Sequence, residues 1–176
     1  MTDALSATVR RTLRPIPDYP KPGILFQDIT PVLRDAPLFR EVIEAMAAPF
    51  VGAGITHVVG IEARGFILGG AVATALGAGF VPARKPGKLP WDCVREAYAL
   101  EYGTDALEAH RDALPAGTRA LVVDDVLATG GTARAAGRLA RTLGAQLVGW
   151  SFLLEIGFLD GRRQLADAEC HAVTTV

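Results

Sequence analysis

Two adjacent carboxylates end an apolar run in "ALVVDDVLATGGT", residues 120–132. The apolar run is typical of a buried strand, so Asp124 and Asp125 should lie at its carboxyl end. Carboxylates are costly to bury there unless they bind something. Sugar hydroxyls donate hydrogen bonds to carboxylates, and hydrated Mg²⁺ can do so through its waters. The pair therefore indicates a ligand site rather than a solvent-exposed turn.

The turn after these aspartates suits an anion. Gly130 and Gly131 let the main chain approach a ligand closely, and Thr129 and Thr132 add hydroxyl donors. A helix expected from about Thr132 would direct its first amides at the same place, as in phosphate sites. A phosphorylated sugar would satisfy both the turn and the carboxylates. The sequence contains neither GxxxxGK[ST] nor GxGxxG, which excludes the P-loop and dinucleotide fingerprints.

The bulk composition predicts one globular domain over residues 1–176. Half of the residues are hydrophobic and 21% are charged, enough for a core. The net charge of -1 gives no general basic surface for nucleic acid. Cys93 and Cys170 match no metal spacing, and the first 14 residues lack an apolar signal region. We expect a reduced, cytoplasmic protein with no nucleic-acid or membrane partner.

Strand and helix patterns alternate along the chain. The uncharged stretch 65–83 approaches the length of a membrane span, but its glycines and Pro82 favour a buried helix followed by a buried strand. The alternation predicts an α/β fold with a mostly parallel central sheet flanked by helices. We expect helices over 3–14, 35–51, 65–76 and 131–144, strands over 56–63, 79–85, 93–103, 119–126 and 145–156, and an exposed loop over 84–92.

The segment "VVDDVLATGGT" resembles the 5-phosphoribosyl-1-pyrophosphate (PRPP) motif of the type I phosphoribosyltransferases. Within them, "PDYPKPGILFQDITPVL", "ARGF", "RKPGKLP", "LEYGTDALEAH" and "LLEIGFLDGR" resemble the adenine phosphoribosyltransferase family, in matching order over roughly residues 17–162. The resemblance implies that Asp124 and Asp125 bind the ribose hydroxyls. It also implies a 5-phosphate cradle formed by Ala128, Thr129, Gly130, Gly131 and Thr132.

The resemblance assigns roles to three further segments. Ala63, where the family often has serine, and Arg64 belong to a pyrophosphate loop "EAR" near which a non-proline cis peptide is common. Arg84, Lys85 and Lys88 lie on a mobile catalytic loop of about 84–100, although "WDCVRE" departs from the family pattern. Glu101 is the implied catalytic carboxylate, and Tyr102 is its gating neighbour. From position alone, Arg64 could equally be a surface arginine, whereas the basic loop and Glu101 would usually be solvated.

The base site is implied at an N-terminal hood formed within about residues 1–33. Phe26 would stack on adenine while the backbones of Leu25 and Gln27 read its edge, and Ile156 would flank the other face. Gln27 replaces a basic residue frequent in the family. Without the resemblance, Phe26 would be taken as a core residue.

The implied reaction joins adenine to PRPP with release of pyrophosphate, giving AMP in purine salvage. Mg²⁺ would bind through PRPP, with Asp124 and Asp125 in its outer shell, and a homodimer is implied. Two alternatives remain: another purine substrate such as xanthine or hypoxanthine, or a PRPP-sensing regulator without catalysis. The regulator is disfavoured because the chain has no spare length for a nucleic-acid-binding module.

Overall fold

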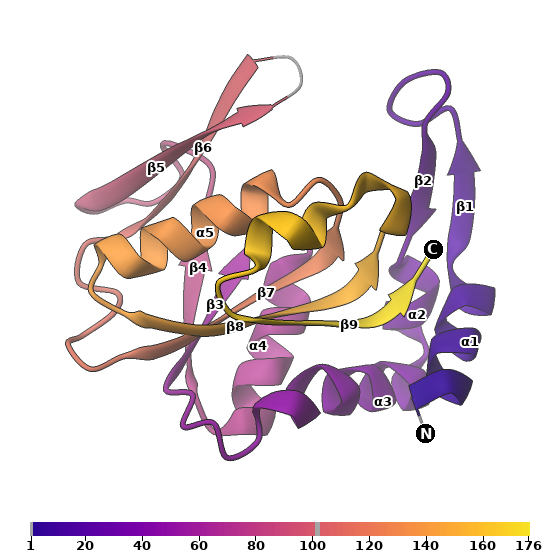
Figure 1. Cartoon of the computed structure of the whole chain (residues 1–176), viewed down its shortest axis with the longest axis horizontal. Coiled ribbons are helices and arrows are strands. Elements are labelled where there is room, and N and C mark those ends of the chain that lie inside the picture. The colour runs from indigo at the N-terminus through magenta and orange to yellow at the C-terminus, as the bar shows by residue number, and fades with distance from the viewer. Residues whose placement is uncertain (1, 101–102) are drawn as a thin grey trace.

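A five-stranded parallel sheet lies at the centre of the protein, whose computed structural model describes residues 2–100 and 103–176 (Figure 1). Neighbouring strands follow the order β4-β3-β7-β8-β9, and each pair is parallel. The sheet confirms the predicted fold class, although its last strand was not predicted. The strands are β3 (His57–Ile61), β4 (Gly79–Ala83), β7 (Arg119–Leu127), β8 (Gln146–Glu155) and β9 (Glu169–Thr175).

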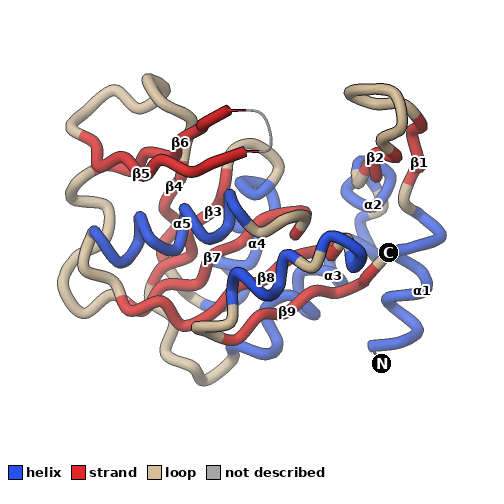
Figure 2. The backbone as a smooth tube through the Cα atoms, turned by 45° about the horizontal axis from the view of Figure 1, so that its top comes forward, coloured by secondary structure: helices blue, strands red, loops and turns tan. Residues whose placement is uncertain are grey.

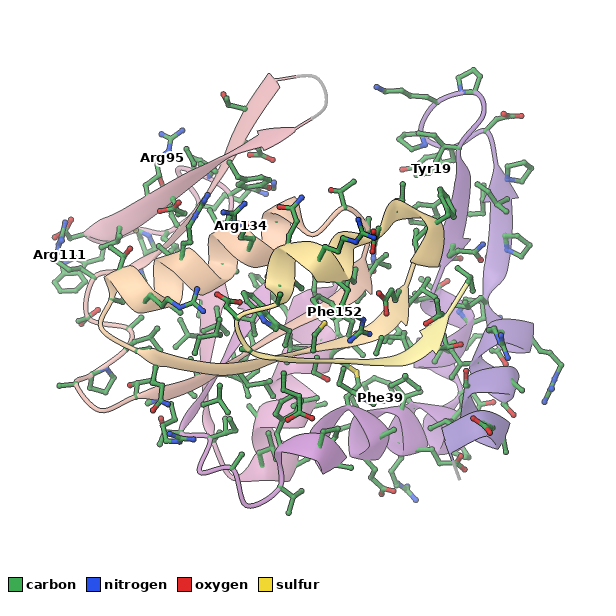
Figure 3. All side chains as sticks on the ribbon, in the orientation of Figure 1. Tyr19, Phe39, Arg95, Arg111, Arg134 and Phe152 are labelled. Carbon is green, nitrogen blue, oxygen red and sulfur yellow. The ribbon has the colours of Figure 1, made fainter. Side chains whose placement is uncertain are left out.

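Helices cover both faces of this sheet, which is why β3, β7 and β8 carry long buried apolar runs. Val59 and Val122 pack in the cluster under α5, whereas Val58 and Leu121 face the opposite helices. Phe152 of β8 is fully buried in the cluster under α5 (Figure 3). One face carries α5 (Gly131–Thr142); the other carries α1 (Thr2–Thr12), α2 (Thr30–Arg34), α3 (Ala36–Ala47), the 3₁₀ helix η1 (Ala48–Phe50) and α4 (Gly65–Leu76).

Two antiparallel hairpins stand apart from the central sheet. The hood pairs β1 (Arg14–Pro17) with β2 (Leu25–Asp28), and the second hairpin pairs β5 (Cys93–Leu100) with β6 (Gly103–His110). Figures 1 and 2 show them rising on the same side of the molecule, at opposite ends. The sequence predicted the first strand of the second hairpin but not its partner β6.

The uncharged stretch 65–83 forms α4 followed by β4, as predicted. Gly77 ends the helix with a φ of 65°, a conformation that glycine adopts without steric cost. Across residues 2–100 and 103–176, no helix has both the length and the apolarity needed to cross a membrane.

Candidate active site

A cavity of about 460 Å³ opens at the carboxyl ends of β3 and β7, where ligands bind in parallel α/β sheets. The hood closes one side of it. Most of the predicted substrate-binding residues line this cavity: Leu25, Phe26, Gln27, Ala63, Arg64, Lys85, Asp124, Asp125, Ala128, Thr132 and Ile156.

The two aspartates lie near the end of β7, as predicted. Asp124 is half-buried and its Oδ1 accepts a hydrogen bond from the Asp125 N–H at 2.9 Å. Asp125 is only 5% exposed, and its Oδ2 accepts a hydrogen bond from Arg64 Nε. A Cβ at Gly65 would lie 2.7 Å from Asp124 Oδ1, so only glycine lets α4 begin this close to the carboxylate.

The aspartate pair carries more negative charge than its surroundings offset. Withdrawal of the Asp124 carboxylate from water, and then the charge on Asp125, raise the pKa of Asp124 well above its usual value. Arg64 opposes this shift but already pairs with Asp125. The strand end is therefore suited to hydroxyl donors or to a hydrated cation, which would relieve the repulsion.

A second, smaller cavity of about 80 Å³ lies inside the turn that follows β7. Gly130 has a φ of 85° and precedes α5, so the turn needs glycine and runs directly into a helix N-terminus. Thr129, Gly130 and Gly131 line this cavity, while Ala128 and Thr132 line both cavities. The peptide groups and helix dipole at such a turn favour an anion, and the role of the turn as a phosphate cradle stays a prediction.

Arg64 connects the aspartate end of the cavity to the hood. Its guanidinium carbon lies 5.3 Å from the centre of the Phe26 ring, while its Nε bonds Asp125. Phe26 also meets Tyr19 of the hood edge-on, with ring centres 5.2 Å apart. Phe26 is half-buried and lines the cavity. The peptide between Glu62 and Ala63 is cis, as the family resemblance indicated.

Glu62 holds the basic loop next to the cavity. Its carboxylate accepts hydrogen bonds from Lys88 Nζ at 2.5 Å and from the Lys85 N–H at 2.9 Å, and Arg84 Nε lies 3.4 Å away. Burial of Glu62 opposes ionisation, but these bonds outweigh it and lower its pKa from 4.5 to about 2. Arg84 and Lys88 do not line the cavity, and their predicted role on pyrophosphate stays a prediction.

Lys85 does line the cavity, yet it is also paired. Its Nζ donates to Tyr98 Oη at 2.9 Å and to the carboxylate of Asp105. Partial burial would lower the pKa of Lys85, but the bonds to Asp105 and Tyr98 raise it. The side chain is therefore a cation at neutral pH, held between β5 and β6.

Asp105 and the cation-holding role of Glu62 escaped the sequence analysis. In the β5–β6 register Tyr98 stands opposite Asp105, so recognising that these two strands pair would have found that carboxylate. For Glu62 the signal was a carboxylate directly after a buried apolar strand, which requires cationic partners. Glu101 and Tyr102 lie outside the described residues.

Comparisons with known proteins settle the family. A family model described as "Phosphoribosyl transferase domain" matches residues 33–169. The chain is 59% identical to an adenine phosphoribosyltransferase from Anaeromyxobacter dehalogenans over 95% of this chain and 97% of the relative. The chain belongs to the adenine phosphoribosyltransferase family.

Solved structures of adenine phosphoribosyltransferases agree with the fold described above. The crystal structure from Rhodothermus marinus is 51% identical, covers 99% of both chains and has a TM-score of 0.95. The Saccharomyces cerevisiae enzyme, complexed with D-2,5-dideoxy-2,5-imino-altritol 1,6-bisphosphate and adenine, is 40% identical with a TM-score of 0.91, covering 97% of this chain and 99% of that chain. These similarities confirm the type I phosphoribosyltransferase fold that the sequence predicted.

Proposed function

We propose that this member of the adenine phosphoribosyltransferase family transfers the phosphoribosyl group of PRPP to N9 of adenine, releasing pyrophosphate and giving AMP. One observation supports the proposal: an aspartate pair, a glycine-rich turn at a helix start and an aromatic hood residue border two cavities that share Asp124, Ala128 and Thr132 in their linings. Each matches a different part of the substrates, namely ribose, 5-phosphate and base.

The sugar phosphate would be fixed at two points. The amides and hydroxyls of residues 128–132 bind the 5-phosphate, and Asp124 and Asp125 accept hydrogen bonds from the ribose hydroxyls. These groups do not react. They use binding energy remote from the reacting carbon to hold it in line with the base.

Departure of pyrophosphate is the demanding event, because cleavage of the glycosidic C–O bond leaves oxocarbenium-like charge on the ribose. Arg64 and Lys85 border the cavity and would stabilise the charge gathering on the leaving group. Arg84 and Lys88 would join them only by leaving Glu62. The segment of about residues 84–100, a loop that continues into β5, is proposed to make this change when substrate binds.

A bound Mg²⁺ would fit the aspartate end of the cavity, where two neighbouring carboxylates line the wall and Arg64 already pairs with one of them. Within residues 2–100 and 103–176, no three histidine, cysteine or acidic side chains gather as a metal site. Asp124 and Asp125 would therefore hold the ion through its waters, with PRPP oxygens as direct ligands. Such an ion supplies charge stabilisation for the leaving pyrophosphate.

Adenine would lie between the hood and Ile156. Phe26 would stack on the base, Leu25 and Gln27 would offer backbone groups along its edge, and Ile156 would flank the other face. All four residues line the cavity. The yeast relative was crystallised with adenine, which supports this choice of base. Glu101 is proposed to handle the adenine proton or to stabilise the cationic ribose, with Tyr102 beside it.

The decisive experiment incubates the protein with adenine, PRPP and Mg²⁺ and follows AMP and pyrophosphate. Parallel reactions with hypoxanthine, xanthine and guanine test base selectivity. We expect AMP as the dominant product. Faster turnover of an oxopurine would assign the enzyme to another base, while PRPP binding without any product would favour the regulator.

We also propose a homodimer in the cytoplasm. Both cysteines are free, Cys93 and Cys170 each being half-buried, which fits a reducing compartment. The homodimer rests on the family resemblance.

A further inference from the structure

The back of the phosphate turn is covered by the main chain of Gly161. A Cβ on Gly161 would lie 2.0 Å from the Ala128 carbonyl oxygen, and one on Gly130 would lie 2.5 Å from the Gly161 carbonyl oxygen. Two backbone segments thus touch with no side chain between them. Any shift of Gly161 must move the turn or open a gap behind it.

Gly161 begins the short 3₁₀ helix η3 (Gly161–Leu165), which is fastened by its next residue, Arg162. Arg162 Nε donates to Glu155 Oε1 at 3.1 Å and Nη2 donates to Oε2 at 2.5 Å. A third donor, Nη1, bonds the carbonyl of Cys170. Glu155 ends β8 and is 8% exposed, so this bidentate pair ties η3 to the central sheet.

We infer that Glu155 and Arg162 are positioning residues that hold Gly161 against the turn that binds the 5-phosphate. The inference rests on the proposed function, because it assigns that turn to the phosphate of PRPP. Neither side chain lines the cavities, so neither is placed in contact with substrate.

The pair should act on the phosphate and not on the base. Ile156 follows Glu155 and lines the base side, but its N–H bonds the Leu127 carbonyl at 2.9 Å, and the next N–H, of Gly157, bonds the Val176 carbonyl at 2.9 Å. These bonds fix Ile156 to neighbouring strands without Arg162. Loss of the ion pair would therefore loosen η3 and the turn it supports before it moved the base site.

The neighbouring Arg163 provides a matched control. It lies on the same turn of η3, its side chain is 84% exposed, and it pairs only locally with Asp160 at 2.5 Å. Arg162→Met and Arg163→Met remove the same charge one residue apart. The experiment compares both with the unchanged protein, measuring KM for PRPP, KM for adenine, kcat and calorimetric binding of ribose 5-phosphate.

For Arg162→Met we expect KM for PRPP to rise about 10- to 100-fold, the range for a displacement of about 1 Å at a binding group. Ribose 5-phosphate should weaken by a similar factor, with KM for adenine unchanged and Arg163→Met like the unchanged protein. Unaltered ribose 5-phosphate binding in Arg162→Met would overturn the inference. An equal loss of adenine and PRPP affinity would also overturn it, since that would show a distortion of the whole site and not of the phosphate turn.

Arg162→Lys is the second test variant, for use if Arg162→Met does not fold. Lysine keeps the charge but cannot form the two-pronged bond, so an intermediate loss of ribose 5-phosphate affinity is expected. Affinity equal to that of the unchanged protein would refute the positioning role. If the unchanged protein binds neither PRPP nor ribose 5-phosphate, the proposed function fails, which is a separate result.

Discussion

Asp124 and Asp125 perform their proposed task because β7 presents both carboxylates at one end of the cavity, although their side chains alternate in direction. One oxygen of Asp125 accepts a hydrogen bond from Arg64, and one oxygen of Asp124 accepts a hydrogen bond from the Asp125 amide. Each keeps lone pairs for a ligand. Because each aspartate has both a structural hydrogen bond and lone pairs for a ligand, the proposed site needs both residues.

Replacing both residues with asparagine tests this arrangement. Asn keeps the size but turns an acceptor-only group into one with two donors, and it removes the partner of Arg64. We expect Asp124→Asn with Asp125→Asn to abolish productive PRPP binding in calorimetry while adenine binding survives. Unchanged PRPP affinity would contradict the assignment of the pair to ribose.

Glu101 carries the clearest catalytic prediction of the sequence. A positioned acid or base contributes about 10²- to 10⁴-fold, so Glu101→Ala should lower kcat by about 10²-fold or more. Steady-state AMP formation at saturating substrates measures this. Near-full turnover would remove Glu101 from the mechanism.

At the scale of the elements, the close contact between the start of α4 and β7 depends on the absence of a side chain at Gly65. Gly65→Ala places a Cβ 2.7 Å from Asp124 Oδ1 and 3.0 Å from the Val123 carbonyl oxygen, so Asp124 must move. We expect PRPP affinity to fall about 10²-fold, as for a misplaced binding group.

The same helix supplies the control. A Cβ at Gly70 meets nothing within 4 Å, so Gly70→Ala should leave PRPP affinity unchanged and stabilise α4 by about 0.5–1 kcal/mol. Equal affinities of the two variants, measured by calorimetry, would show that Asp124 tolerates the added methyl group.

The basic loop is joined to the end of β3 by the ionised form of Glu62. Its pKa is lowered in the folded protein from 4.5 to about 2, so the pairing stabilises the fold above pH 4.5 and is lost as the pH falls toward 2. We expect Glu62→Gln to be less stable at pH 6, with the difference shrinking as the pH falls below 4.5. Chemical denaturation at several pH values measures it, and a constant difference would refute the link.

At the scale of the whole molecule, the parallel sheet and its flanking helices followed from the alternation of apolar runs with helical patterns. In the helix predicted over 35–51, the apolar residues Leu38, Val42, Ile43 and Met46 are buried in α3, at the spacing of one helix face. The strand β6 was missed because "GTDALEAH" lacks a strong apolar alternation. Whether this segment forms a strand depends on its pairing with β5, and the local sequence does not specify that pairing.

For the same reason, the sequence predicted only part of the candidate site. Residues in one short segment, such as 124–132, could be recognised together because local spacing carried the chemistry. Three ion pairs join separate segments of the chain: Lys85 with Asp105, Lys88 with Glu62, and Arg162 with Glu155. No local pattern specifies those partners.

The predicted homodimer belongs to this scale as well. We expect light scattering coupled to size-exclusion chromatography to give about twice the chain mass of 18.6 kDa. A mass of one chain at enzyme concentrations that support full activity would contradict it.

Four cations proposed to meet PRPP already have carboxylate partners: Arg64 with Asp125, Arg84 and Lys88 with Glu62, and Lys85 with Asp105. Any of them that turns to pyrophosphate must give up one anion to gain another. The electrostatic contribution to donor affinity is thus a difference between two sets of ion pairs. Raising the ionic strength screens both sets, so binding should weaken less with added salt than four uncommitted positive charges would suggest.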